Sequence, residues 1–326
     1  MIDETADHEE YSWLDTLSKN PLPVLLKAAP LPIRYQILRD ILEDEESDDY
    51  QLLQKNLRKH KSRRKILAEQ SKRGLWPIDG KINGLDQTQI DALQFIIQLE
   101  TLHELLDLLV TNKQEKVNLG MREVIRFLAE NKLPLRIHHL TQAIYLAIAF
   151  ELDSNPIIKQ LIWDIFKQQN ADGGWSSLPE ENDSCLWSSL FILWTLGHSK
   201  QFHNNRTLKK GLQYVESNLL SGDQSKLLPG LQPWDTLISG THGLSILSGG
   251  TLRYLETVQL YDDGVKNRKA EKRLDWLIGS QLKTGLWPSI VNRDKQGDHG
   301  VTLRVLKVLK HFQTQRINET LSYDAN

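Results

Sequence analysis

The sequence contains one short pattern three times: a glutamine, a glycine four residues later and a tryptophan two residues after that. The copies QSKRGLW, QNADGGW and QLKTGLW begin at Gln70, Gln169 and Gln281. Their starts lie 99 and 112 residues apart, and each interval is about twice the length of a helical hairpin of roughly 50 residues. The spacing therefore predicts a chain of repeated helical hairpins, with a degenerate hairpin between successive copies.

Each residue of this pattern has a structural explanation. A helix ends with carbonyl groups that lack partners, and glycine allows the left-handed conformation that turns the chain there. The tryptophan covers the helix end with apolar surface, and its indole N–H needs an acceptor. The glutamine side chain, one turn earlier, either supplies that acceptor or bonds the exposed backbone. We interpret the pattern as a structural clasp without a catalytic role.

Around the clasps, polar helical patterns alternate with more apolar ones. Polar helices are expected near residues 50–70, 114–131, 155–169, 205–220 and 265–281. Apolar helices are expected near residues 86–109, 137–151, 184–197, 237–258 and 299–313. Strand patterns are nearly absent. Together with helices in the region 11–44, this predicts an all-α fold of about six hairpins, with a ring of apolar helices inside a ring of amphipathic ones.

Composition excludes several classes of protein. Hydrophobic residues make up 40% of the 326 residues and charged residues 25%, which is typical of a soluble globular protein. The net charge of −2 gives no basic excess for nucleic acid, and no apolar run reaches the ~18 residues of a membrane span. The acidic N-terminus is unlike a secretory signal. The single cysteine fits a cytoplasmic location.

We expect one domain over residues 1–326, with a loose tail at 1–10 and a polar tail at 314–326. Two charged segments stand out within it. Residues 43–49 form an acidic connector, and residues 59–65, KHKSRRK, form a basic run. We interpret the connector as a solvated linker and the basic run as the solvated face of an outer helix, in preference to a nucleic-acid patch.

Residues with chemical potential gather at the starts of the expected apolar helices. If inner and outer helices alternate in direction, the inner helices are parallel and their N-termini share one end of the barrel. The residues found at these starts are His138, His139, Asp183, Cys185, His242, Asp298 and His299. Cysteine, histidine and carboxylate groups are zinc ligands, and helix N-termini favour anions.

Three of these residues also have plain structural interpretations. Asp183 is a candidate helix N-cap, Cys185 a small buried hydrophobic residue, and His242 a hydrogen-bonded histidine near a helix start. The inner helices also carry aromatic residues, expected inside the barrel or between the layers: Phe95, Tyr145, Phe150, Trp187, Phe191, Trp194 and Tyr254. Aromatic walls suit apolar or carbocationic ligands, although aromatic residues at helical spacing are more often core.

The three copies match the repeat of squalene–hopene cyclases. From about residue 30 to residue 313, the sequence resembles the α/α-toroid superfamily of those cyclases and of protein prenyltransferase β subunits. The resemblance implies an α/α toroid whose central cavity binds an isoprenoid-type apolar ligand. Trp187 and Phe191 belong to the candidate ligand-binding set, together with His138, His139, Asp298 and His299.

The match to prenyltransferase β subunits extends to individual residues. Those proteins bind zinc with an Asp-x-Cys pair at the start of one inner helix and a histidine at the start of the next. The resemblance therefore implies Asp183, Cys185 and His242 as zinc ligands. It also implies that His138 or His139 contacts an isoprenoid diphosphate. In that chemistry zinc lowers the pKa of a substrate thiol and holds the thiolate for alkylation.

Two features depart from these families. The loop before Asp183, SSLPEEN, carries Glu180 and Glu181 and no basic residue, so it would neutralise a diphosphate poorly. The D-x-D-D general acid of the cyclases has no counterpart on an inner helix, because the nearest string, ESDD at 46–49, lies in the acidic connector. The expected function is binding of an isoprenoid-type ligand, with zinc-assisted prenyl transfer or related carbocation chemistry. The alternative is a non-catalytic toroid that binds a partner protein or a small molecule.

Overall fold

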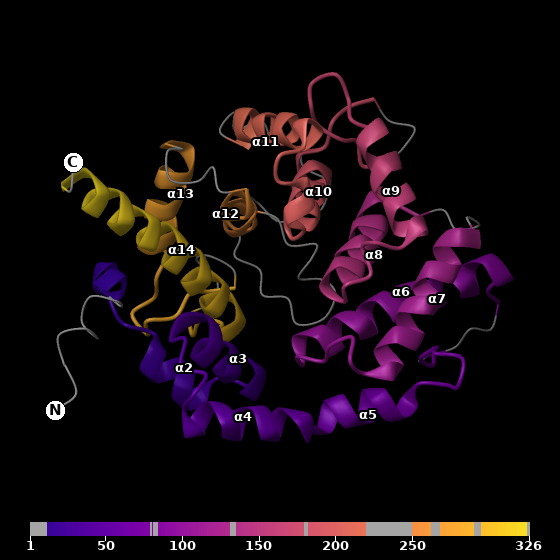
Figure 1. Ribbon diagram of the computed structural model, residues 1–326, viewed down its shortest axis with the longest axis horizontal. Helices are drawn as coiled ribbons and strands as arrows, with labels where there is room; N and C mark the ends of the chain where they lie inside the picture. Colours follow the sequence, from indigo (N-terminus) through magenta and orange to yellow (C-terminus); the bar gives the residue numbers. More distant parts are fainter. Residues whose placement is uncertain are drawn as a thin grey trace. The chain divides into compact units, whose positions relative to one another are not determined.

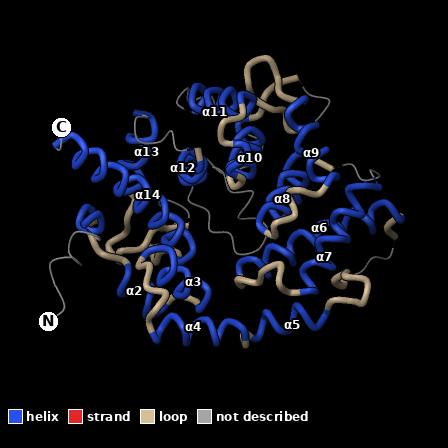
Figure 2. Tube along the Cα trace, viewed as in Figure 1, coloured by secondary structure: helices blue, strands red, loops and turns tan. Residues whose placement is uncertain are grey.

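The computed structural model describes residues 12–78, 80, 84–130, 135–178, 182–219, 250–261, 268–289 and 295–324. Within these ranges the chain consists of helices, turns and loops, without a strand (Figure 2). The predicted all-α fold class is confirmed. The chain divides into two compact units, and the expected single domain stays a prediction. The central unit comprises Leu57–Leu231 and Gly240–Leu247; the terminal unit comprises Met1–Asn56, Gln232–Ser239 and Ser248–Asn326.

The central unit has two layers of helices (Figure 1). Its helices are α5 (Lys61–Glu69), α6 (Gln87–Asp107), α7 (Glu115–Glu130), α8 (Ile137–Ala149), α9 (Pro156–Lys167), α10 (Leu186–Gly197) and α11 (Arg206–Leu219). Helix α8 packs against both α6 and α10, which makes these three the inner layer. Helices α5, α7, α9 and α11 pack outside them. Every residue of α10 is buried, as expected for an inner helix covered on all sides.

The terminal unit joins the two ends of the chain. It contains η1 (Ser12–Thr16), α2 (Leu22–Ala28), α3 (Leu31–Gln36), the π-helical turn η2 (Ile37–Ile41), most of α4 (Asp48–Arg58), α12 (Gly250–Leu260), α13 (Arg268–Gly279) and α14 (His299–Asp324). Helix α12 packs against α13 and α14, and α14 packs against η1, α3 and η2. Lys310 of α14 donates to the carbonyls of Asp40 and Ile41 at the end of η2, at 3.2 and 3.0 Å.

Two expected helices differ from the structure. The helix expected at 50–70 is two helices, α4 and α5, because His60 has extended backbone geometry with ψ of 131°. A continuous helix would have placed Lys59 against Arg63 at the i,i+4 spacing at which like charges repel. The last helix, expected to end at residue 313, continues to Asp324. Of the helix expected at 237–258, the part before residue 250 lies outside the described residues.

The three clasps share one hydrogen-bond pattern. Each glutamine Nε2 donates to the carbonyl of its own glycine and to a carbonyl of the adjacent outer segment. The second acceptors of Gln70, Gln169 and Gln281 are Lys116, Thr207 and Lys19, at 2.8, 2.7 and 2.6 Å. The glycines have φ of +93°, +93° and +91°, which confirms the left-handed turn. Each clasp therefore ties its loop to the outer segment beside it.

The tryptophans complete the clasps. Each indole N–H donates to the carbonyl ten residues earlier, with Ile66, Ile165 and Leu277 as acceptors at 2.8, 2.7 and 2.6 Å. Of the two roles considered for the glutamine, bonding the backbone is therefore the correct one. Each tryptophan backbone N–H donates to an inner-helix side chain, with Gln98, Ser189 and Thr302 as acceptors at 2.9 Å in every case. These bonds fix the inner helices against the loops that precede them.

Among the described residues, no helix combines the length and the apolar character needed to cross a bilayer.

Candidate functional site

A stack of aromatic rings shows how the inner helices of the central unit are aligned. His103 of α6 stacks on Tyr145 of α8 with ring centroids 5.4 Å apart, and Tyr145 stacks on Trp194 of α10 at 4.6 Å. His198, just after α10, meets Trp194 edge-on at 4.5 Å. His103, Tyr145 and Trp194 lie three or four residues before the ends of their helices. The three helices are therefore parallel, with their C-terminal ends level, as the sequence predicted.

The opposite ends of α8 and α10 are level too, because Tyr145 and Trp194 each lie eight residues after the first residue of their helix. The first turns of both helices therefore lie at the same end of the inner layer. The first turn of α8 contains His138 and His139, and that of α10 follows Cys185 directly. This shared N-terminal end, which we call the rim, is the candidate site.

The histidine pair forms one half of the rim. The Nε2 atoms of His138 and His139 are 3.2 Å apart, and both side chains are half-buried. Burial lowers the pKa of His138 to about 4, with further contributions from His139 and Arg136. Burial and Arg136 also lower the pKa of His139. Both imidazoles are therefore neutral at pH 7.

The hydrogen bonding of the pair leaves one ring nitrogen without a partner. Nδ1 of His139 is buried and has no hydrogen-bond partner among the described residues. A buried donor or acceptor without a partner costs free energy. One of the two Nε2 atoms carries a proton and donates to the other, and the tautomer decides which. Nδ1 of His139 lacks a partner in either tautomer.

Cys185 forms the other half of the rim. Its side chain is 7% exposed and packs with Trp187 and Phe191, which are 1% and 3% exposed. Cys185 occupies the N-cap position of α10, but its side chain makes no capping hydrogen bond. The first backbone N–H groups of α10 therefore receive no acceptor from the residue where a helix usually finds one.

The same position in the third repeat is occupied differently. Cys185 and Asp298 both donate their backbone N–H to the carbonyl of the clasp tryptophan, at 2.8 and 2.7 Å. Asp298, however, also accepts the N–H of Val301 through Oδ1 at 2.9 Å, so its carboxylate caps α14. His299 is the first residue of α14 and is half-buried. Asp298 and His299 belong to the terminal unit, and their expected role in ligand binding stays a prediction.

Neighbouring side chains hold the backbone before Cys185. The hydroxyl of Tyr214 donates to the carbonyl of Ser184 at 2.9 Å, and the hydroxyl of Ser184 donates to Asp172 at 2.5 Å. Burial, together with the nearby Asp172 and Cys185, raises the pKa of Tyr214 above its ordinary value. Tyr214 therefore stays protonated and keeps its donor role, which fixes the approach to α10.

The remaining predicted zinc ligands are not assembled in the described structure. Asp183 is exposed and does not cap α10, so its alternative interpretation as the N-cap is wrong. His242 lies outside the described residues. Among the residues that are described, no three His, Cys, Asp or Glu side chains are grouped to hold a metal ion. Zinc at Asp183, Cys185 and His242 stays a prediction.

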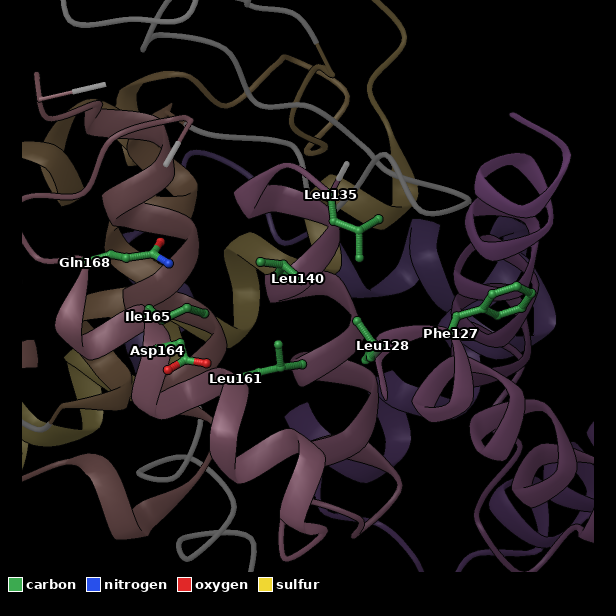
Figure 3. Close-up of a pocket in the computed structure, with 8 residues that line it drawn as sticks. All are labelled: Phe127, Leu128, Leu135, Leu140, Leu161, Asp164, Ile165 and Gln168. Carbon is green, nitrogen blue, oxygen red and sulfur yellow. The ribbon is translucent and has the colours of Figure 1, made fainter. Parts of the chain in front are cut away.

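A small apolar pocket adjoins the start of α8 from the outer side. Its volume is about 190 Å³, and its lining comes from α7, α9 and the chain around the first turn of α8: Phe127, Leu128, Leu135, Leu140, Leu161, Asp164, Ile165 and Gln168. The leucine side chains face one another in Figure 3. The volume is below the roughly 300–1,000 Å³ of small-molecule sites. This pocket is therefore too small for a long isoprenoid chain, and the expected central cavity stays a prediction.

Sequence reasoning missed two groups of residues. The tryptophan anchors Gln98, Ser189 and Thr302 follow their clasps by 22, 14 and 15 residues, an interval that only an alignment of the three repeats could reveal. His103 and His198 were not expected in the aromatic stack. The i,i+4 spacing of Trp194 and His198 was the available signal.

Neither a protein-family model nor a curated protein matches the sequence. Among solved structures, the chain is similar to the type II terpene cyclase MstE from Scytonema in its apo form, with a TM-score of 0.29 and 11% identity over 77% of this chain and 95% of that one.

Variants of the same cyclase give comparable values. The complex with the substrate geranylgeranyl dihydroxybenzoate has a TM-score of 0.27 and covers 93% of this chain; the complex with the product merosterolic acid A has 0.28 and covers 92%. Each match spans 98% of the cyclase at 11% identity. At TM-scores below 0.5, this likeness supports no statement about the substrate or the reaction of the chain.

Proposed function

We propose that the chain binds an apolar, isoprenoid-type ligand at the rim, and that Asp183, Cys185 and His242 hold a zinc ion there. The observation that supports this most directly is the difference between Cys185 and Asp298. Two equivalent positions make the same backbone bond, yet only Asp298 caps its helix. Cys185 leaves a stabilising cap unmade beside the aromatic pair Trp187 and Phe191, at the same end of the inner layer as the neutral histidine pair.

The chemistry of the rim suits a ligand that is apolar with one polar end. Trp187 and Phe191 provide a buried aromatic surface beside Cys185. The N-terminus of α10, which the Cys185 side chain does not cap, favours an oxygen with partial or full negative charge. The neutral histidine pair contributes a ring nitrogen, Nδ1 of His139, that has no partner among the described residues and can bond a hydroxyl group. An isoprenoid alcohol satisfies all three features, and its diphosphate satisfies the first two.

The donor set supports zinc over other metals. Thiolate, imidazole and carboxylate together are typical ligands of Zn²⁺, and the Cys185 sulfur is not engaged in capping α10. When bound, zinc would supply Lewis acidity and activate a thiol or water molecule. The chain's own residues bind and orient: Tyr214 fixes the backbone before Cys185, and the histidine pair positions the polar end of the ligand.

The ligand is tested with dansyl-labelled geranylgeraniol, whose fluorescence reports binding close to a tryptophan. We expect saturable binding that weakens at least ten-fold in Cys185→Ser and His139→Ala. Trp163→Ser is the matched control, because Trp163 is 56% exposed on the outer helix α9, and it should bind like the unchanged protein. Absence of saturable binding would overturn the ligand and favour the non-catalytic, partner-binding alternative.

Zinc is tested separately by elemental analysis of the purified protein. One zinc per chain, lost in Cys185→Ala and in His242→Ala, is the expected result. Metal-free protein after purification and after incubation with zinc salts contradicts the zinc site, whatever the outcome of the ligand test. Circular dichroism of each variant distinguishes metal loss from unfolding.

A further inference from the structure

The run from Arg58 to Lys65 concentrates positive charge on the outer surface of the central unit. Six of its eight residues are lysine or arginine and none is acidic, although the whole chain has a net charge of −2. Five of these side chains are exposed: Arg58, Lys59, Lys61, Arg64 and Lys65. The run covers the last residue of α4, the bend at His60 and the first half of α5.

The orientation of these charges opposes the stability of α5. Acidic residues stabilise the N-terminal turn of a helix and basic residues the C-terminal turn, because of the helix dipole. Helix α4 follows this rule, with Asp48 and Asp49 at its start and Arg58 at its end. Helix α5 reverses it, with three basic residues in its first four positions and Glu69 at its end. The charges of α5 therefore interact unfavourably with the dipole of their own helix.

The fold does little to neutralise the four lysine and arginine residues Lys59, Lys61, Arg64 and Lys65. Lys65 pairs with Glu69 at 3.6 Å, and both side chains are exposed. Within the part of the chain that the structure describes, Lys59, Lys61 and Arg64 take part in no ion pair. Burial and the nearby Arg58 lower the pKa of Arg63, which shows that like charges are crowded here. Such crowding is relieved when an external anion binds.

We propose that the exposed basic run Arg58–Lys65 is a docking surface for the anionic phospholipid headgroups of a membrane. A cluster of four to eight basic residues is sufficient to bind an anionic bilayer electrostatically. Such binding is reversible and is screened by salt, and it needs no spanning helix.

Charge along α4 favours a lipid surface over nucleic acid. Six of the seven residues 43–49 are acidic, and Asp48 and Asp49 begin the 11-residue helix that ends at Arg58, about 15 Å away at 1.5 Å per residue. A nucleic-acid backbone that followed α4 would meet this acidic connector. Lipid headgroups can be engaged locally and can rearrange around it. The proposed function fits as well, since isoprenoids dissolve in bilayers, but the charge argument does not depend on it.

The test is co-sedimentation of the full chain with vesicles. Vesicles of phosphatidylcholine with about 30% phosphatidylglycerol are compared with phosphatidylcholine alone, at about 50 and 500 mM salt. We expect binding to the anionic vesicles at low salt, loss of binding at high salt, and no binding to neutral vesicles. The variant Lys59→Gln/Lys61→Gln/Arg64→Gln/Lys65→Gln should bind at least ten-fold more weakly.

A matched control removes the same number of charges from other exposed lysines of the central unit, in Lys113→Gln/Lys159→Gln/Lys200→Gln/Lys209→Gln. This control should retain the binding of the unchanged chain, and circular dichroism verifies that both variants are folded. Equal binding by the two variants overturns the proposal, as does equal binding to neutral vesicles.

Two competitors identify other sources of the anion. Displacement from vesicles by millimolar inorganic phosphate would assign the run to a free phosphate ion, and tighter binding to a duplex oligonucleotide than to vesicles would assign it to nucleic acid. Either result overturns the membrane surface. Binding of dansyl-geranylgeraniol is measured without vesicles, so failure here and failure of the proposed function are separate outcomes.

Discussion

The second and third repeats start their inner helices on the same backbone scaffold but with different side chains. Cys185 and Asp298 both bond the clasp tryptophan through the backbone, and Ser189 and Thr302, four residues later, both accept that tryptophan's N–H. Only Asp298 adds a cap to its helix. The comparison teaches that the backbone bonds define the repeat, whereas the first side chain of the inner helix is free to take a role outside the fold.

The first repeat extends this comparison. The carbonyl of its clasp tryptophan, Trp76, accepts a hydrogen bond from Nε2 of Gln94 at 2.8 Å. In the other two copies the tryptophan carbonyl accepts a backbone N–H instead. A side chain thus replaces a backbone group, and Gln98 accepts the Trp76 N–H as Ser189 and Thr302 do in their copies. The bonding requirement of the loop is constant, and the residue that meets it varies. Because the backbone bonds of the second repeat are all made, the side chain at Cys185 can differ from the capping aspartate of the third repeat.

The largest expected effect separates two of the three clasp glycines, Gly173 and Gly285. In Gly173→Ala the new methyl group would lie 2.8 Å from the carbonyl oxygen of Lys210, at φ of +93°. We expect a loss of about 3–4 kcal/mol in the free energy of unfolding, from backbone strain and overpacking together. In Gly285→Ala the new methyl group meets the flexible side chain of Lys19 at 3.3 Å and the carbonyl oxygen of Asn20 at an ordinary 3.6 Å, and the variant should lose about 1–2 kcal/mol.

Urea denaturation of both variants measures this difference. Equal losses would show that backbone strain alone decides the cost, and that the close approach of the second clasp to α11 has no energetic weight.

The next effect tests whether the two scaffolds are equivalent. Ser189→Ala leaves the backbone N–H of Trp175 buried without an acceptor, and Thr302→Val does the same to Trp287. Each variant should lose about 2 kcal/mol, the cost of an unsatisfied buried donor. Urea midpoints give both values. A neutral Ser189→Ala would break the comparison, because the scaffold of the second repeat would then not depend on this bond.

The third prediction concerns pH, because the rim of the central unit contains the titratable pair His138 and His139. The folded-state pKa of His138, about 4, is below the ordinary value of 6.5, so the unfolded chain takes up the proton first. The stability contribution is complete above pH 6.5 and is lost as the pH falls towards 4. Discounted for the partial exposure of His138, the loss is about 1–2 kcal/mol. Denaturation from pH 7 to 4.5 measures it, and His138→Gln should flatten the profile.

The smallest effect is the cap itself. Asp298→Ala removes the acceptor of the Val301 N–H and should cost about 1 kcal/mol. Cys185→Ser supplies a capping hydroxyl to α10 and should add about 0.5 kcal/mol, while it weakens ligand binding at the rim. Thermal unfolding of the metal-free proteins compares the two. A destabilised Cys185→Ser would mean that the thiol is needed for packing with Trp187 and Phe191.

The fold could be predicted as far as local bonding determines it. The clasp was predictable because its glutamine, glycine and tryptophan satisfy backbone groups within a few residues of one another. The bend at His60 was not predictable, since no glycine or proline marks it. The same holds for Glu43, Leu109 and Glu151, which have φ of 51°, 56° and 60° at helix ends, where glycine is the usual signal.

The candidate site was predictable in position but not in geometry. Helix starts identified His138, His139 and Cys185, because parallel inner helices bring their first turns to one end. The contact between the two imidazoles and the bare Nδ1 of His139 depend on side-chain rotation, which no periodicity encodes. The missing cap at Cys185 became visible only beside Asp298. His242 lies outside the described residues, so the zinc ligands Asp183, Cys185 and His242 stay a prediction from the sequence.

The third clasp joins the two ends of the chain, so it can form only late in synthesis. Gln281 donates to the carbonyl of Lys19, and the two residues are separated by 262 positions. At roughly 5–20 residues per second, the ribosome delivers this partner roughly 15–50 s after the segment that needs it. Until α14 follows, the surfaces of η1, α3 and η2 that pack against it have no partner, so a chaperone that shields the nascent N-terminus would raise the yield of folded protein.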